Sequence, residues 1–316
     1  MKNDLIWAYM LKLSHHMWDD ETSPARGWYL KPQYTETNNT DIAVWDETVK
    51  YCAECGFNLI LVDVGDGVRY ESHPEISAPD AWDKDFLKKK LDEMRALGIE
   101  PIPKLNFSTG HDTWLKKYRR MISTDIYYAV CADLVREVCE VFGWPRFFHL
   151  GFDEESPNFQ TRRDICIVRN ADLWWHDLNF LAAECEKHNA RPWIWSDYCW
   201  HHRDLFLKNM SKSILQSNWY YGTFNDSLSG QPLTCVETYE LLDAHGFDQI
   251  PTCSTWSNIT NTRQTIGHGK AKLSKEHLLG YLTAPWMFTT RENSMTLLAD
   301  AQRFWFARKE FYPESF

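Results

Sequence analysis

Two adjacent acids end an apolar segment of this chain. Residues 147–155 read FFHLGFDEE, so Asp153, Glu154 and Glu155 follow apolar residues at once. Neighbouring carboxyl groups disfavour each other's ionisation, and burial raises the pKa of one further, so a proton donor can exist near neutral pH. Glycoside cleavage needs such an acid on the leaving oxygen. Asp153 and Glu154 are therefore candidate catalytic residues, and the alternative is a solvated loop after a strand.

Strand-like segments that could carry these acids recur along the whole chain. The eight expected strands are about 5–11, 58–64, 100–106, 146–152, 191–197, 212–217, 248–254 and 278–285. Parallel strands joined by helices through right-handed crossovers, eight times over, predict a closed (β/α)8 TIM barrel in the α/β class. A doubly wound open sheet is the alternative, but no glycine-rich phosphate turn follows the first strand. We expect one domain, 1–316.

Helix-period segments separate these strands, weakly so after the fifth and the seventh. Residues 84–97 place leucines and a methionine on one helical face, and Gly98 ends that helix before the next strand. The helix before the seventh strand is expected to begin with a capping box of Thr234 and Glu237. A last helix is expected near 293–309.

Charge and composition narrow the classes of partner. The net charge is −10 and no basic block occurs, so we expect neither nucleic acid nor a membrane surface as a partner. No apolar run nears the ~20 residues of a membrane span, and no secretory signal is visible. Nine cysteines without a zinc-type pattern indicate reduced thiols in a cytoplasmic protein. A secreted protein trimmed of its leader stays open, as does a homodimer.

Tryptophans gather where the expected strands end. In such a barrel, functional residues lie at the carboxyl ends of the strands. The seven tryptophans that follow six of the eight strands are Trp18, Trp114, Trp195, Trp200, Trp219, Trp256 and Trp286. Aromatic rings stack on the C–H faces of a sugar, while carboxylates, amides and histidines hold its hydroxyl groups. The set predicts a carbohydrate substrate, and the alternative is a plug of core tryptophans.

Several blocks resemble those of one known family. His149-Leu-Gly-Phe-Asp153-Glu154 resembles the H-x-G-G-D-E signature of family 20 glycoside hydrolases, the β-N-acetylhexosaminidases, with Phe152 at the second glycine. Pro103-Lys-Leu-Asn106 with Gly110-His111 resembles P-E-x-D-x-P-G-H, Trp195-Ser-Asp197 resembles W-x-[DE], Gln216 and Trp219 resemble Q-x-W, and Gly280 to Trp286 keeps the spacing of G-G-x-A-x-x-W. Because the first strand is expected near residue 5, we expect no small N-terminal domain of the kind common in that family.

The resemblance implies a retaining exo-glycosidase with substrate-assisted catalysis and without cofactor or metal. In that mechanism the 2-acetamido oxygen of the substrate attacks the anomeric carbon. Glu154 would be the acid/base, and Asp153 would orient and polarise the acetamido N–H. Glu155 is expected to be a surface or supporting acid.

The rim of the expected site departs from the family pattern. His15 stands where the family has an arginine, Trp256-Ser-Asn258 where it has Y-x-D, and Phe288 where it has a glutamate, and Tyr220 or Tyr221 would replace the missing tyrosine. The expected substrate-binding residues are His15, Asn106, His111, His149, Trp195, Asp197, Trp219, Tyr220, Tyr221, Trp256, Asn258 and Trp286.

Three other functions stay open on the sequence. A glycosidase acting on a sugar without an acetamido group would use an enzymic nucleophile, for instance Asp63, Asp197 or Glu292. A metal-dependent barrel of the sugar-isomerase kind would use Glu154, Asp197 and histidines. A non-catalytic barrel would bind sugar without turnover.

Overall fold

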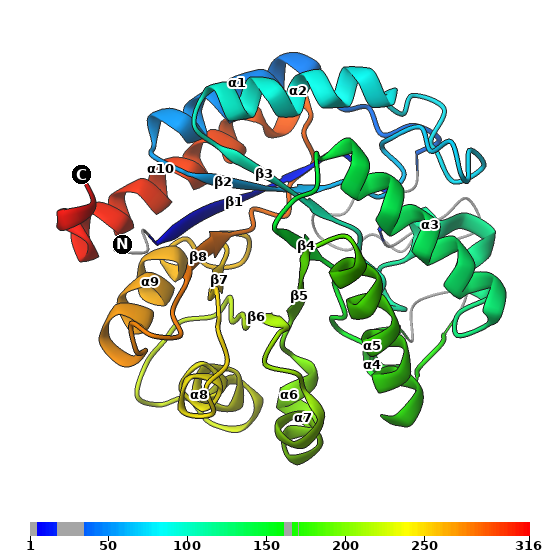
Figure 1. Cartoon of the computed structure of the whole chain (residues 1–316). Helices are drawn as coiled ribbons and strands as arrows, with labels where there is room; N and C mark the ends of the chain where they lie inside the picture. The colour runs from blue at the N-terminus through cyan, green and yellow to red at the C-terminus, as the bar shows by residue number, and fades with distance from the viewer. Residues whose placement is uncertain (1–4, 18–34, 161–165, 170) are drawn as a thin grey trace.

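Eight parallel strands form one sheet, and the helices lie around it (Figure 1). The computed structural model describes residues 5–17, 35–160, 166–169 and 171–316. The strands are β1 Ile6–Lys12, β2 Leu59–Asp63, β3 Glu100–Lys104, β4 Phe147–His149, β5 Arg191–Trp195, β6 Leu215–Ser217, β7 Thr252–Cys253 and β8 Gly280–Thr283. Seven of these strands lie inside the segments expected from the sequence, and β1 extends one residue past the end of its expected segment.

The sheet closes on itself between β6 and β7. The strand order is β6-β5-β4-β3-β2-β1-β8-β7, and every pairing is parallel. Isolated bridges join Gln216 to Gln249 and Trp219 to Thr252 across the seam. The Ile250 N–H donates to the Gln216 carbonyl at 2.9 Å, and the Thr252 N–H donates to the Asn218 carbonyl at 2.9 Å. The prediction of a (β/α)8 barrel is confirmed, whereas the single domain of 1–316 stays a prediction.

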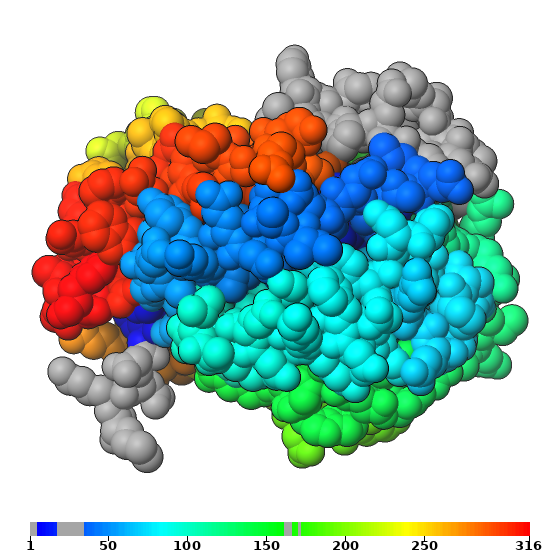
Figure 2. Space-filling view, turned by 90° about the horizontal axis from the view of Figure 1, so that it is seen from above, coloured from blue at the N-terminus to red at the C-terminus, as the bar shows by residue number. Residues whose placement is uncertain are grey.

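The helices follow the strands in chain order. They are α1 Ile42–Glu54, α2 Lys84–Ala96, α3 Asp125–Val141, α4 Pro157–Gln160, α5 Ala171–Lys187, α6 Tyr198–His201, α7 Arg203–Asn209, α8 Gly230–Ala244, α9 Asn261–Lys272 and α10 Ser294–Phe311, with 3-10 helices η1 Thr113–Arg120, η2 Arg291–Asn293 and η3 Pro313–Ser315. Figure 2 shows α10, α1 and α2 side by side across one face. None of the described helices is long and apolar enough to span a membrane.

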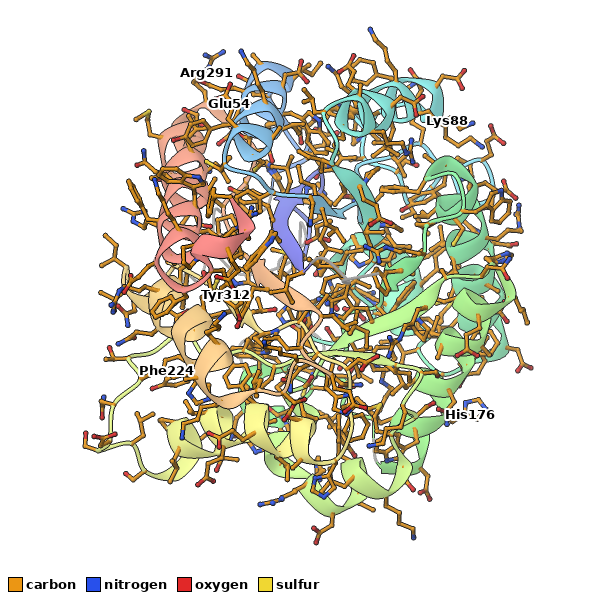
Figure 3. All side chains as sticks on the ribbon, turned by 60° about the vertical axis from the view of Figure 1, so that its left-hand side comes forward. Glu54, Lys88, His176, Phe224, Arg291 and Tyr312 are labelled. Carbon is orange, nitrogen blue, oxygen red and sulfur yellow. The ribbon has the colours of Figure 1, made fainter. Side chains whose placement is uncertain are left out.

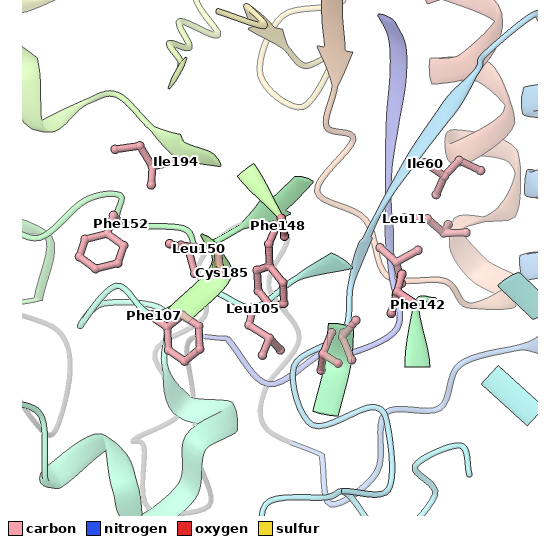
Figure 4. Packing of buried hydrophobic residues seen from close by; sticks show 14 of the residues in the cluster. Leu11, Ile60, Leu105, Phe107, Phe142, Phe148, Leu150, Phe152, Cys185 and Ile194 are labelled. Carbon is pink, nitrogen blue, oxygen red and sulfur yellow. The ribbon is translucent and has the colours of Figure 1, made fainter. Parts of the chain in front are cut away.

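Alternation along the strands divides the core into two layers. In β1, Ile6, Ala8 and Met10 belong to the apolar cluster inside the barrel, whereas Trp7 and Tyr9 belong to the cluster beneath the helices. This is the period of two that a strand buried on both faces requires. Figure 4 shows part of the outer cluster around β4.

Two local expectations can be compared with the structure. The capping box is wrong: α8 begins at Gly230, and Thr234 lies inside it, where its hydroxyl donates to the Gly230 carbonyl at 3.3 Å. The Thr234–Glu237 spacing matched a capping box inside the helix, and Pro232 is tolerated in the first turn because the N–H that it lacks is not used there. All nine cysteines are free, and eight of them are buried.

Candidate active site

The acid pair lies on a tight backbone turn directly after β4. Gly151, Phe152 and Glu154 have positive φ angles of 80°, 69° and 55°. A Cβ on Gly151 would lie 1.9 Å from Asn106 Oδ1, so only glycine fits there. For a residue with a side chain, this conformation costs roughly 1–2 kcal/mol. The surrounding structure must therefore hold Phe152 and Glu154 in place.

Phe152 stands where the family signature has its second glycine, and packing holds it there. Its ring is buried and lies 5.4 Å from the Trp174 ring in an edge-on contact. The Arg169 guanidinium lies over the Phe152 ring, 4.6 Å from its centroid. Figure 4 shows Phe152 with Leu150 and Phe107 in the same cluster. Burial of a large ring in this way offsets the strain of its backbone.

Asp153 is a buried carboxylate with several donors. Asn106 Nδ2 donates to Oδ1 at 3.0 Å, and Ser108 Oγ donates to the same oxygen at 2.9 Å. His111 Nε2 lies 3.3 Å from Oδ2. Burial alone would raise the pKa of Asp153, but the charge and hydrogen bond of His111, with Lys104 and Asn106, hold it well below its usual range. Asp153 is therefore ionised at neutral pH.

Glu154 lies beside Asp153 and is the more exposed of the two. Its side chain is 31% exposed, against 7% for Asp153. His111 Nε2 lies 3.0 Å from Glu154 Oε2 and so is shared by both acids. Burial would lower the pKa of His111, but Asp153 and Glu154 together raise it. A carboxyl group that reaches the surface beside a fixed anion can exchange a proton with a bound molecule.

Asp197 completes the cluster from the end of β5. Its Oδ2 accepts the Glu154 N–H at 2.8 Å, and its Oδ1 accepts from Trp219 Nε1 at 3.3 Å. Burial, followed by the charge of Asp153, raises the pKa of Asp197 well above its usual range. The structure thus brings together five of the expected residues: Asn106, His111, Asp153, Glu154 and Asp197.

Aromatic side chains surround this cluster. Trp219 stacks on Tyr221, with ring centroids 5.0 Å apart, and meets Trp200 edge-on at 4.6 Å. Trp195 lies 5.9 Å from Trp286. Trp195 is fully buried inside the barrel, so Trp219 and Trp286, which are half-buried and pack against the same cluster, are the two of these tryptophans that a ligand could contact.

The two candidate tyrosines after β6 lie on different sides of the chain. Tyr221 stacks on Trp219, whereas the Tyr220 ring packs edge-on against Phe224, at 5.4 Å. Burial raises the pKa of Tyr221 well above its usual range. Because side chains alternate along an extended segment, only one of two adjacent tyrosines can face the acid cluster. That residue is Tyr221.

His149 and His15 have pKa values lowered by burial and by a neighbouring lysine. His149 Nδ1 accepts the Gly151 N–H at 3.1 Å, and its ring lies 4.4 Å from Trp195. Burial and Lys104 lower the pKa of His149 well below its usual range. The His15 ring stacks on Phe288 at 4.0 Å, and burial, then Lys12, lowers its pKa to about 3. His15 is therefore uncharged where the family has an arginine.

The loop after β7 holds the remaining expected residues. Asn258 Oδ1 accepts from the Thr260 N–H and hydroxyl at 3.0 and 2.9 Å, and its Nδ2 donates to Thr223 Oγ1 at 3.0 Å. Its side chain is thus engaged in forming a turn. Trp256 is half-buried, and its N–H donates to Ser254 Oγ at 3.1 Å. Trp18 lies outside the described residues.

Two of the alternative nucleophiles lie in settings unlike that of Glu154. The Asp63 side chain is buried, with Oδ2 at 3.0 Å from Lys104 Nζ and 3.9 Å from Lys12 Nζ. Glu292 is exposed in η2, and Figure 3 shows its neighbour Arg291 at the edge of the molecule. Asp63 is therefore held as a buried ion pair, and Glu292 is open to solvent.

Some contributors to the site were not expected from the sequence. Glu155, expected as a surface or supporting acid, has a side chain only 3% exposed and forms a buried ion pair with Arg169. Ser108, which donates to Asp153, follows Asn106 by two residues, a spacing that could have indicated it. Arg169 has no such signal, because it lies outside every recognised block.

One group of these residues has the chemistry of a cation site. The ligand atoms of His111, Asp153 and Glu154 lie within 4.8 Å of one another. One imidazole and two carboxylates match the donors that zinc and related cations accept. Among the residues that the structure describes, this is the group that could hold a cation.

Solved structures share this fold. The Flavobacterium johnsoniae chitobiase of glycoside hydrolase family 20 is 17% identical, with a TM-score of 0.61 over 96% of this chain and 48% of that chain. A Vibrio harveyi family 20 exo-β-N-acetylglucosaminidase, solved with N-acetylglucosamine, is 12% identical. Its TM-score is 0.63 over 98% of this chain and 57% of the Vibrio enzyme. Dispersin B is 12% identical, with a TM-score of 0.61 over 98% of this chain and 99% of dispersin B.

These likenesses show that the chain folds as the same kind of barrel. The chain spans about half the length of the chitobiase and of the Vibrio enzyme, at 48% and 57%. No family model and no curated protein sequence matches it.

Proposed function

We propose that this protein is a retaining, exo-acting glycoside hydrolase of the β-N-acetylhexosaminidase type. The observation that carries the proposal is the acid pair itself. Asp153 is buried, ionised and held by three neighbours, while Glu154 beside it reaches the surface and shares His111 with it. One fixed anion and one exposed carboxyl group are the two functions that substrate-assisted cleavage requires.

In the proposed reaction, Glu154 protonates the leaving oxygen while the substrate's acetamido oxygen attacks the anomeric carbon. Asp153 accepts the acetamido N–H and stabilises the positive charge that develops on the cyclised group. Glu154 then removes a proton from the incoming water, which restores the anomeric configuration. Trp219 and Trp286, which are both half-buried, provide the apolar surface for the sugar ring and the acetamido methyl group.

The acid role is tested with aryl N-acetylglucosaminides whose phenols differ in pKa. Glu154→Gln should lower kcat/KM about 10²–10⁴-fold for a phenol of high pKa and far less for dinitrophenol, because a good leaving group needs no proton. Glu292→Gln is the matched control and should act as wild type. The proposal fails if Glu154→Gln cleaves the high-pKa substrate at the wild-type rate. Loss of activity in Glu292→Gln would favour an enzymic nucleophile.

Acetamido recognition is tested with the two adjacent tyrosines. The Tyr221 hydroxyl is the phenol that faces the aromatic surface, and it would donate to the acetamido oxygen. Tyr221→Phe should lower kcat/KM for N-acetylglucosaminides about tenfold, the effect of losing one hydrogen bond of about 1.4 kcal/mol. Tyr220→Phe, whose ring packs on Phe224, should leave it unchanged. Equal effects of the two variants, or equal rates on glucosides and N-acetylglucosaminides, would contradict this recognition.

A second candidate function is favoured by the group of His111, Asp153 and Glu154, which could hold a divalent cation. A metal-dependent sugar isomerase would need that cation to polarise a carbonyl oxygen. Dialysis against a chelator separates the two functions. Turnover of N-acetylglucosaminides that survives the chelator supports the glycosidase, whereas aldose–ketose exchange that returns only with added Mn²⁺ or Zn²⁺ supports the isomerase.

A further inference from the structure

Arg169 is a buried arginine in the segment before α5, and it is 4% exposed. Its Nε donates to Glu155 Oε2 at 2.9 Å, and one of its terminal nitrogens donates to Glu155 Oε1. Its other terminal nitrogen donates to Asp177 Oδ2 at 3.0 Å. The guanidinium also lies 4.6 Å from the Phe152 ring centroid. The Arg169 side chain therefore contacts both Phe152, which precedes Asp153, and Glu155, which follows Glu154.

The same guanidinium reaches the loop that binds Asp153. It donates to the Phe107 carbonyl at 3.2 Å, and the next residue, Ser108, donates to Asp153 at 2.9 Å. The backbone that carries the acids and the backbone that carries a donor to Asp153 thus share one anchor. Movement of Arg169 would change both at once.

Arg169 is itself fixed to the outer helices. Asp177, on α5, accepts from Ser123 Oγ at 2.6 Å and from Tyr128 of α3 at 2.5 Å, in addition to Arg169. The planar guanidinium offers five N–H donors in a rigid arrangement, which lysine cannot reproduce. The turn after β4 is thereby tied to two helices.

We propose that Arg169 is a positioning residue for the acid pair Asp153 and Glu154. Phe152 and Glu154 adopt the left-handed backbone region, with φ of 69° and 55°. Such conformations persist only where neighbouring contacts enforce them, and Arg169 contacts the residue on each side of the pair. The inference rests on the proposed function for its kinetic consequence, because a displaced acid slows proton transfer without removing substrate contacts.

A matched control arginine lies at the opposite end of the barrel. Arg308 of α10 is 8% exposed, donates to the Gly56 carbonyl at 2.6 Å and lies 4.6 Å from the Trp7 ring. It is also buried, bound to a backbone carbonyl and stacked on an aromatic ring. Trp7 is the second residue of β1, whose other end faces the site, so Arg308 tests the loss of a buried guanidinium far from the acids.

The test compares Arg169→Met and Arg308→Met as full-length proteins with an aryl N-acetylglucosaminide. Arg169→Met should lose about 10²-fold in kcat, the effect expected of a displacement of about 1 Å, while KM changes less than about threefold. Arg308→Met should melt at a lower temperature with unchanged kcat. Methylguanidinium should restore part of the kcat of Arg169→Ala, and methylammonium should not. A folded Arg169→Met with wild-type kcat overturns the proposal.

Hydrogen–deuterium exchange separates this proposal from the proposed function. If wild type cleaves no glycoside, the proposed function fails, but the positioning role is still measurable. Arg169→Met should then accelerate exchange of the amides of residues 151–155 at least tenfold relative to Arg308→Met. Equal exchange of these amides in the two variants overturns the positioning role whether or not the enzyme is active.

Discussion

Asp153 and Asp197 are buried carboxyl groups that both lie beside Glu154, yet their pKa values are displaced in opposite directions. Burial by itself raises the pKa of both carboxyl groups. For Asp153, His111 and Lys104 outweigh it and lower the pKa. For Asp197, the charge of Asp153 adds to it and raises the pKa. The neighbours of each carboxyl group, not its type, therefore decide which of the two is the anion.

Asp112 allows the electrostatics of this region to be tested by pH. Burial raises its pKa from 3.8 to about 7, and Arg119 offsets this only in part. Since the folded-state pKa lies above the unfolded one, the contribution of Asp112 to stability is complete below about pH 4 and is lost as the pH rises through about 7. Asp112→Asn should leave the free energy of unfolding unchanged near pH 4 and raise it by up to about 4 kcal/mol at pH 8. Urea unfolding at both pH values measures this difference.

Asp177 provides the control of opposite sign. Burial would raise its pKa, but Arg169, Ser123 and Tyr128 lower it overall. Its contribution to stability is therefore present above its ordinary pKa and is lost as the pH falls. Asp177→Asn should lower the free energy of unfolding at pH 8 and approach wild type in acid. If Asp112→Asn also destabilised the protein at pH 8, the burial argument for Asp112 would be wrong.

At the scale of elements, the turn after β4 determines where the acids lie. β4 itself has only three residues, Phe147–His149, and the next five residues leave the strand through three positive φ angles. Two loops and one helix meet this turn, through Asn106, Asp197 and Trp174. A short strand with an enforced turn gives the acids a fixed direction at the barrel rim.

Gly151→Ala tests this turn against a matched glycine. Gly151 and Gly98 have nearly the same φ, 80° and 78°, but a Cβ at Gly98 would have no atom within 4 Å, whereas one at Gly151 would clash with Asn106. Gly98→Ala should therefore cost only the backbone strain of about 1 kcal/mol. Gly151→Ala should cost about 3 kcal/mol or more, because overpacking adds to that strain, and should lower kcat. Chemical denaturation of both variants gives the two values, and equal costs would show that Asn106 moves aside freely.

At the scale of the whole molecule, barrel closure brings distant segments to one rim. The acids follow β4, their histidine follows β3, and the tryptophans follow β5, β6 and β8. The hydrogen bonds across the β6–β7 seam complete this arrangement. Each of these loops contributes only a few side chains, up to the three that follow β3, and no single segment contains the site.

The sequence by itself determined the positions of all eight strands and the place of Asp153 and Glu154 at the end of the fourth. These features depend on local signals: apolar periodicity, glycines at helix ends, and an abrupt change from apolar to acidic residues. The same locality explains the error at α8, where a capping box matched the pattern inside a helix that begins four residues earlier.

Only the tertiary structure decided which side chains meet the acids. It selected Tyr221 over Tyr220, buried Glu155 against Arg169, and engaged Asn258 in a turn. Such contacts join segments that lie far apart in the chain, and each depends on the direction in which a side chain leaves its backbone. Sequence spacing determines neither the contacts between distant segments nor the directions of the side chains. Both are fixed only when the barrel closes and its loops pack against one another.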